Sequence, residues 1–405
     1  MGSTPVIGAP ALSARVRVHS LDIFRGLTMA VMIFVNDLAG VKGLPWWTYH
    51  MPSKQSGMTY VDVVFPAFLF IVGMSIPFAV ERRLERGDSW LRLWTHILLR
   101  SFSLIVLGLI LANAGKPDPR LTGLPAGAWA TLALVGGILF WLVYPSRGRR
   151  GLWLALKYFG LVLLVVALAI FRRSTPNGGT AWLDFRYWEI LGLIGRVYLA
   201  ACILYIPFRK LRWAPAALLA ALTALNVASR MGMTPLQRLF PYALWPFDSG
   251  ELPSIAIAGV LAHQIFFDDR GPAASFRRKA MLAAAYAAAL LAGGWAFTFL
   301  GISKNAATPA WCLYSCGASV VLFLAIYWIA DVRGHRAWAA FAAPAGSNTL
   351  LTYLLPDLFY FTLGGVYSAW TPHAGWPGVI RSVLFTACML AISWVLTRWK
   401  IRMQL

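Results

Sequence analysis

The 405-residue chain is poor in charged residues, and acidic residues are especially scarce. Asp and Glu together number 15 against 36 Lys and Arg, and charged residues make up only 13% of the chain. A soluble globular domain carries about 25% charged residues. Hydrophobic residues reach 59% and the mean hydropathy is +0.65. This composition excludes an ordinary soluble domain and predicts an all-α, polytopic integral membrane protein.

The chain also has few cysteines and lacks the common catalytic motifs. Its four cysteines, Cys202, Cys312, Cys316 and Cys388, lie in or beside apolar segments, so we interpret them as small hydrophobic residues. Cys312 and Cys316 are one helical turn apart, but no His or carboxylate joins them at ligand spacing, so no metal site is expected. A Gly-rich phosphate loop and a Ser-x-Gly nucleophile elbow are also absent.

Long apolar runs, by contrast, recur along the whole sequence. About 20 residues at 1.5 Å each cross roughly 30 Å of hydrocarbon. We therefore predict about 12 transmembrane helices, of which the seventh and eighth have the weakest pattern. The segments are 21–37, 60–81, 92–113, 125–145, 152–171, 187–207, 213–229, 252–267, 278–300, 308–330, 345–366 and 377–397.

The net charge of +21 is spread over short loops, which is typical of a topology signal and not of a nucleic-acid site. When the loops are assigned alternately to two sides, 21 basic residues fall on one side and 10 on the other. The positive-inside rule then predicts that both termini are cytoplasmic. Residues 1–20 form a polar N-terminal tail without an apolar signal-peptide core, so no cleavable signal is expected.

This topology leaves two histidines, His50 and His373, on the outer side. Imidazole suits proton transfer near neutral pH, so both are candidate bases. His50 lies in a Trp-rich segment before the predicted start of the second span. Thr59 and Asp62 at that start have capping-box spacing. Asp62 therefore either caps the helix or supports the chemistry of His50.

Polar residues inside apolar segments are costly and indicate a functional or paired role. Arg100 lies within the third span and Arg25 at the inner end of the first, where Asp22 could pair with it one helical turn away. Asn348 and Asp357 lie in the eleventh span. For Asp357 the alternative to a functional role is a hydrogen bond at the kink that the preceding proline produces.

One further buried cation, Arg196, lies in the sixth span. Glu189 precedes it by seven residues and could pair with it directly or across helices. A paired arginine of this kind would have a structural role.

The segments LDIFRGLTMAVMIFVN (21–36) and GMTYVDVVFPAFLFIVGMSIP (57–77) resemble the two leading motifs of the heparan-alpha-glucosaminide N-acetyltransferase family and its bacterial relatives. Pro356 stands where this family has the His of a His-Glu pair, and Asp357 matches its acid. Further segments resemble later motifs of the family in the same order: 98–113, 190–201, 245–264, 302–317 and 346–357.

This resemblance implies that residues 21–405 form a transmembrane acyltransferase-like domain. It would move an acetyl group from cytoplasmic acetyl-CoA, its donor substrate, to an amine or hydroxyl of an amino sugar or glycan outside the membrane. His50 would be catalytic, with Asp62 and Asp357 in support or orientation. Other residues are assigned to the substrates: Arg25, Arg100 and Asn348 to the donor, whose phosphates favour cations, and Asp248, Lys304 and Asn305 to the sugar.

Two mechanisms remain open for His50. It could abstract a proton from the acceptor as the acceptor attacks the thioester, or it could carry the acetyl group itself before passing it on. The acceptor atom, nitrogen or oxygen, is likewise open.

A different class of function, a secondary transporter of a small solute or glycan precursor, has the same layout of twelve spans. Such transporters usually contain two related halves, and no repeat joins residues 1–205 to 206–405. An inactive partner in polysaccharide export is a third alternative. The expected partners are a sugar or glycan acceptor and the lipid bilayer, with a homodimer left open and no nucleic acid. The expected location is the inner (cytoplasmic) membrane, with the active-site loops on the periplasmic side.

Overall fold

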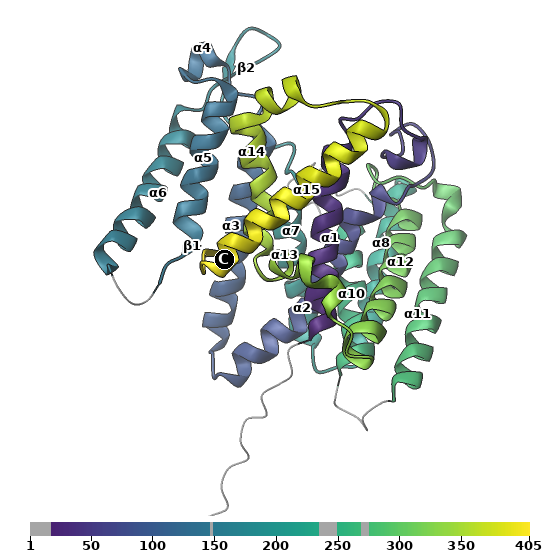
Figure 1. Ribbon diagram of the computed structural model, residues 1–405. Coiled ribbons are helices and arrows are strands. Elements are labelled where there is room, and N and C mark those ends of the chain that lie inside the picture. The colour runs from purple at the N-terminus through teal and green to yellow at the C-terminus, as the bar shows by residue number, and fades with distance from the viewer. Residues whose placement is uncertain (1–17, 146–148, 235–248, 269–274) are drawn as a thin grey trace, which may run out of the picture.

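The computed structural model describes residues 18–145, 149–234, 249–268 and 275–405, and α-helices dominate these ranges (Figure 1). Twelve of the described helices have 16 residues or more. In chain order they are α1 (His19–Leu38), α2 (Val61–Glu85), α3 (Trp90–Asn113), α5 (Ala126–Trp141), α6 (Arg150–Ile170), α7 (Ile190–Tyr205), α8 (Ala214–Arg230), α10 (Glu251–Phe267), α11 (Phe276–Ala296), α12 (Pro309–Tyr327), α14 (Thr349–Trp370) and α15 (Gly375–Arg398).

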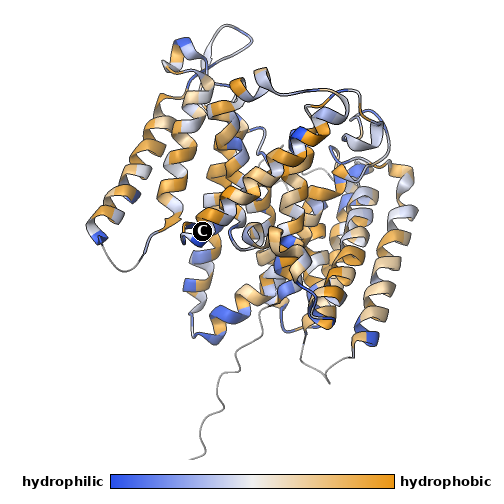
Figure 2. Cartoon of the chain, viewed as in Figure 1, coloured by the Kyte–Doolittle hydropathy of each residue, from blue (hydrophilic) through white to orange (hydrophobic). Residues whose placement is uncertain are grey.

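These helices coincide with the twelve predicted spans. Eight helical stretches within the described ranges are long and apolar enough to cross a membrane, namely those built on α2, α3, α6, α7, α11, α12, α14 and α15. The helices α5, α8 and α10 are apolar but shorter. Figure 2 shows hydrophobic residues along the helices and hydrophilic residues gathered mainly near their ends. The prediction of an all-α polytopic membrane protein is therefore confirmed.

Short elements connect the long helices. The loop 39–60 between α1 and α2 defines what we call the outer end of the bundle, following the predicted topology, and the opposite end is the inner end. The short helical elements are η1 (Trp46–Thr48), α4 (Pro119–Thr122), η2 (Ile206–Phe208), η3 (Thr298–Leu300), the π-helical turn η4 (Trp328–Val332), η5 (Ala337–Ala342) and α13 (Ala343–Ser347). The two-residue strands are β1 (Leu142–Val143), which pairs antiparallel with β4 (Arg402–Met403), and β2 (Arg173–Ser174), which pairs antiparallel with β3 (Thr180–Ala181).

Helix α1 lies in the middle of the bundle and packs against α2, α12, α13, α14 and α15, while the pair α5 and α6 stands at one edge (Figure 1).

At the outer end of α1, the carboxylate of the buried Asp37 contacts four side chains. Its carboxylate lies 3.0 Å from Arg381 Nη2 and 2.6 Å from Ser382 Oγ on α15. It also accepts hydrogen bonds from the hydroxyls of Tyr360 (2.6 Å) and Tyr367 (3.1 Å) on α14. This carboxylate therefore joins α1 to both C-terminal helices.

Helices α2 and α10 approach until their backbones touch. A Cβ atom added to Gly73 would lie 1.8 Å from the carbonyl oxygen of Ala256, and one added to Gly259 would lie 2.0 Å from that of Phe70. Both distances are far below van der Waals contact, so neither position accepts a side chain. Small residues at such crossings allow membrane helices to pack closely.

The predicted span 345–366 was wrong at its start, because two helices meet there. Asn348 has φ −126° and ψ 45°, which ends α13, and α14 begins at Thr349. The Asn348 amide donates to the carbonyl oxygen of Ile401 at 2.9 Å, and its Oδ1 accepts from the Met403 amide at 3.2 Å. A side chain expected to bind the donor thus holds the C-terminal segment in place, and its assignment to acetyl-CoA stays a prediction.

Candidate functional site

The exposed His50 and the buried Asp62 form a pair at the outer end. Nδ1 of His50 lies 2.7 Å from Oδ1 of Asp62, and the two side chains are 43% and 1% exposed. A carboxylate in this position accepts the Nδ1–H of a neutral imidazole. The lone pair is then on Nε2, the nitrogen that does not face Asp62, so His50 is arranged as a proton acceptor.

Asp62 is held in place by the start of α2. Its other oxygen, Oδ2, accepts hydrogen bonds from the backbone amides of Thr59 (2.9 Å) and Met51 (3.2 Å). The Thr59 contact is the one expected of a capping box. The backbone carbonyl of Asp62 also accepts from the indole of Trp311 on α12 at 3.2 Å. The two alternatives for Asp62 are therefore both present in the geometry, because one oxygen caps the helix and the other contacts His50.

Lys304 approaches His50 from the loop before α12. Its Nζ lies 3.1 Å from Nε2 and 3.4 Å from Nδ1. An ammonium in line with the Nε2 lone pair would lie much farther from Nδ1, so Lys304 stands beside the ring and leaves that lone pair open. Burial lowers the pKa of Lys304, and the charge of Asp62 opposes this shift in part. The neighbouring Asn305 is exposed in the same turn.

His373, the other histidine expected outside, is arranged differently. Its Nδ1 accepts a hydrogen bond from Arg381 Nη1 at 2.6 Å, and its Nε2 lies 2.7 Å from the carbonyl oxygen of Ser368. Both ring nitrogens are thus occupied, one as acceptor and one as donor. Because Arg381 also contacts Asp37, His373 belongs to the structural network at the end of α1.

Asp357 was expected to support His50, but it lies in a separate cavity. This cavity of about 80 Å³ lies between α1, α7 and α14 and does not include His50. No hydrogen bond joins Asp357 to His50 or Asp62 in the parts of the chain that the structure describes. The cavity is lined by Met29, Met32, Ile33, Asn36, Glu189, Tyr353, Pro356, Asp357 and Tyr360.

Sequence reasoning missed three polar members of this cavity, Asn36, Tyr353 and Tyr360. Asn36 carried a signal, since it is a polar residue near the end of a buried apolar helix. Glu189 was interpreted only as a partner for Arg196. The Arg196 guanidinium lies 4.0 Å from the ring centre of Trp188, and no arginine is among the described residues that line the cavity.

At the inner end, Arg25 joins three helices. It contacts Asp22 Oδ1 at 3.3 Å, as the ion-pair alternative required, and it also donates to Ser75 Oγ on α2 (3.0 Å) and to the carbonyl oxygen of Gly346 in α13 (3.2 Å). Arg100 lies over the ring of Tyr198, 5.0 Å from its centre. Arg25 and Arg100, both predicted to bind the donor, lie in the halves of α1 and α3 nearer the inner end.

The remaining predicted residue, Asp248, lies outside the described residues.

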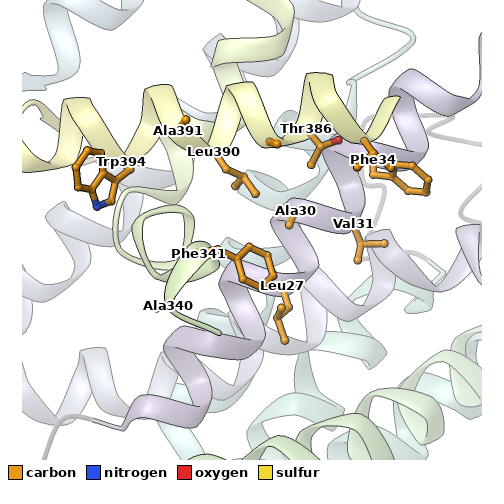
Figure 3. A pocket seen from close by; sticks show the side chains of 12 residues that line it. Leu27, Ala30, Val31, Phe34, Ala340, Phe341, Thr386, Leu390, Ala391 and Trp394 are labelled. Carbon is orange, nitrogen blue, oxygen red and sulfur yellow. The ribbon is translucent and has the colours of Figure 1, made fainter. Parts of the chain in front are cut away.

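A larger cavity of about 650 Å³ lies between α1, η5 and α15 (Figure 3). Its walls are almost wholly apolar, with Leu27, Phe34, Phe341 and Leu390 among them. None of the residues predicted for the site lines it, so it offers no chemistry to the proposed reaction.

The region that carries His50 and Asp62 matches a known protein family. A family model described as "Domain of unknown function (DUF5009)" matches residues 17–250, which is more than half of the chain and includes both His50 and Asp62. The chain belongs to this DUF5009 family.

This DUF5009 protein is also similar to two curated proteins. It is 42% identical over 97 residues to the heparan-alpha-glucosaminide N-acetyltransferase of Mus musculus and 41% identical over 97 residues to that of Homo sapiens. Each match covers 24% of this chain and 14% of the relative. The resemblance stated from the motifs is thus confirmed as a family-level relationship.

Proposed function

We propose that this DUF5009 protein transfers an acetyl group from acetyl-CoA to the amino group of a sugar at the outer end of the bundle. The 2.7 Å contact between His50 and the buried Asp62 carries this proposal. It supplies an oriented base on a membrane protein related to N-acetyltransferases. We place the reaction at the outer face of a cytoplasmic membrane, with the donor entering from the inner end.

The chemistry follows from the positions of three side chains. A free amine attacks the thioester carbonyl, and Nε2 of His50 takes the proton that the nitrogen loses. Asp62 stabilises the resulting imidazolium through Nδ1–H. The ammonium of Lys304, 3.1 Å from Nε2, stabilises the oxyanion of the tetrahedral intermediate. As the C–S bond breaks, the proton passes from His50 to the thiolate, which leaves as CoA thiol. An acetyl-His50 intermediate remains the alternative order of steps.

The donor is expected to lie along the bundle axis. Its phosphates carry several negative charges, which the guanidinium groups of Arg25 and Arg100 in the inner halves of α1 and α3 would attract. The thin arm of the donor would then extend toward His50.

Removal of His50 tests the proposal directly. We expect purified wild-type protein in nanodiscs to bind acetyl-CoA in calorimetry and to release thiol when glucosamine is added. His50→Ala should bind the donor equally but lose about 10²- to 10⁴-fold in thiol release. His335→Ala, which removes an exposed histidine, is the matched control and should behave like wild type. Absence of acetyl-CoA binding by folded wild-type protein would refute the proposal.

Asp62→Asn tests whether orientation of the imidazole matters. The amide oxygen can still accept from the Thr59 amide, so α2 should still begin normally. The amide NH₂ then faces Nδ1 of His50 and donates to it, which places the ring proton on Nε2 and removes the base, so thiol release should fall about 10²-fold or more with little change in donor affinity. An unchanged rate would assign Asp62 to the helix cap alone.

A further inference from the structure

The cavity between α1, α7 and α14 brings two carboxyl groups together inside the bundle. Oε1 of Glu189 accepts from the Tyr353 hydroxyl at 2.7 Å, and Oε2 accepts from the Leu191 amide at 2.9 Å. Asp357 lines the same cavity. Its side chain is partly buried and makes no hydrogen bond with any residue in the described ranges.

Among the described residues that line the cavity there is no Lys, Arg or His, and all are neutral except the two carboxyl groups. A buried acid within a membrane bundle is costly unless it is paired or serves a ligand. The cavity is therefore suited to one cation that carries hydrogen-bond donors.

The size and lining of the cavity indicate which cation fits. About 80 Å³ holds two or three groups the size of water, which is enough for an ammonium and its first carbon but too small for a whole sugar. Besides the two acids, the side chains of Asn36, Tyr353 and Tyr360 offer oxygen acceptors. An ammonium has three donors, which these oxygens can satisfy.

We propose that this cavity binds the protonated primary amine of the acceptor between Glu189 and Asp357. The proposal rests on the proposed function for the identity of the acceptor as an amino sugar. An ammonium is not a nucleophile, so R–NH₃⁺ first passes one proton to a carboxylate and becomes R–NH₂ beside a carboxylic acid. The cavity lies at the same end of the bundle as His50, because α1 ends two residues after Asn36 and continues into the loop that carries His50.

This arrangement also separates substrate from product. The acetylated amine is a neutral amide and cannot pair with the two acids. The charge that holds the substrate is thus removed by the reaction, and the product has no reason to stay. Selection of an amine over a hydroxyl follows from the same charge.

Binding measured without donor tests this site. Glucosamine, N-acetylglucosamine and glucose are titrated by calorimetry into the full-length protein in nanodiscs. We expect wild-type protein to bind glucosamine well and to bind N-acetylglucosamine and glucose much more weakly. Asp357→Asn and Glu189→Gln should each weaken glucosamine binding about tenfold or more, since each removes a charged contact. Asp88→Asn, at the inner end, is the matched control and should bind like wild type.

A competition experiment on wild-type protein needs no variant. Methylammonium should displace glucosamine, whereas tetramethylammonium, which has no hydrogen-bond donor and is too large, should not. Equal glucosamine affinity in Asp357→Asn and wild type, or equal binding of N-acetylglucosamine and glucosamine, would overturn the proposal. Because no donor is present, these results are independent of acetyl transfer, so the site and the proposed reaction can fail separately.

Discussion

Asp62 shows how one side chain can serve structure and chemistry together. Its Oδ2 accepts hydrogen bonds from the Thr59 amide just before α2 and from the Met51 amide in the loop of His50, while its Oδ1 faces His50. The helix start therefore fixes the position of the carboxylate that orients the imidazole. Any substitution at this position changes both functions unless it keeps an acceptor on each side, and the amide of Asn keeps only one.

Lys304 should make the reaction sensitive to alkaline pH. Burial lowers its pKa below the ordinary value of about 10.4, so its ammonium is lost at a lower pH than that of an exposed lysine. The oxyanion needs the charged form, and the contribution of Lys304 should therefore be complete below its lowered pKa and disappear as the pH rises through it. Lys304→Arg should remove this decline, because arginine stays charged, and Lys304→Met should lower kcat about 10²-fold.

The measurement is kcat for thiol release from pH 7 to pH 10.5, expressed as the ratio of wild type to Lys304→Arg. This ratio cancels the ionisation of the acceptor amine, which affects both proteins equally. Lys54→Arg, an exposed lysine in the His50 loop, serves as control. A ratio that does not fall with pH would exclude an ionising Lys304 from the chemical step.

Individual functional residues could be predicted from the sequence more readily than the contacts between them. His50 and Asp62 lie twelve positions apart around a predicted helix start, so their contact was a reasonable expectation. Asn36, Glu189 and Asp357 come from three helices far apart in the chain. Periodicity does not report which helices adjoin. For the same reason the sequence could not show that Asp357 lines a cavity with Glu189 that does not include His50.

Helices α2 and α10 should tolerate no side chain at their crossing. Gly73→Ala places a Cβ against the Ala256 carbonyl, and the helices must separate to admit it. We expect a loss of about 1–3 kcal/mol or more, seen as a lower Tm in detergent. Gly365→Ala makes the same change in α14, where nothing lies within 4 Å, and should be neutral or stabilising. Equal Tm values for the two variants would contradict the close packing.

Hydropathy predicted the helices well because a span needs little more than an apolar run of sufficient length. It located α8 and α10 despite their 17 residues. It did not find the break at Asn348, since the whole segment 345–366 is apolar enough on average to be interpreted as one span, and the break depends on bonds to the distant C-terminal segment. Features set by local composition are thus visible in the sequence, and features set by tertiary hydrogen bonds are not.

The topology of the whole molecule can be tested with two cysteines. Lys54 lies in the loop 39–60 and Arg149 in the loop before α6, and both are exposed. In a Cys388→Ser background, where the remaining cysteines are buried, Lys54→Cys should react with a membrane-impermeant maleimide in intact cells. Arg149→Cys should react only after the membrane is opened. The reverse pattern would invert the topology and place His50 on the cytoplasmic side.

Helix α1 carries Arg25, assigned to the donor phosphates, and Asn36, which lines the cavity proposed for the acceptor amine. The distance between these residues sets a minimum length for the donor. Arg25 and Asn36 are eleven residues apart, which corresponds to roughly 16 Å along a helix with a rise of 1.5 Å per residue. A donor whose phosphates rest at Arg25 must carry its acetyl group on an arm of at least that reach. A small activated acetate such as acetyl phosphate is too short for this, so its acetyl group would stay near the inner end. Selection among donors would then depend on reach, a property fixed by eleven residues of one helix.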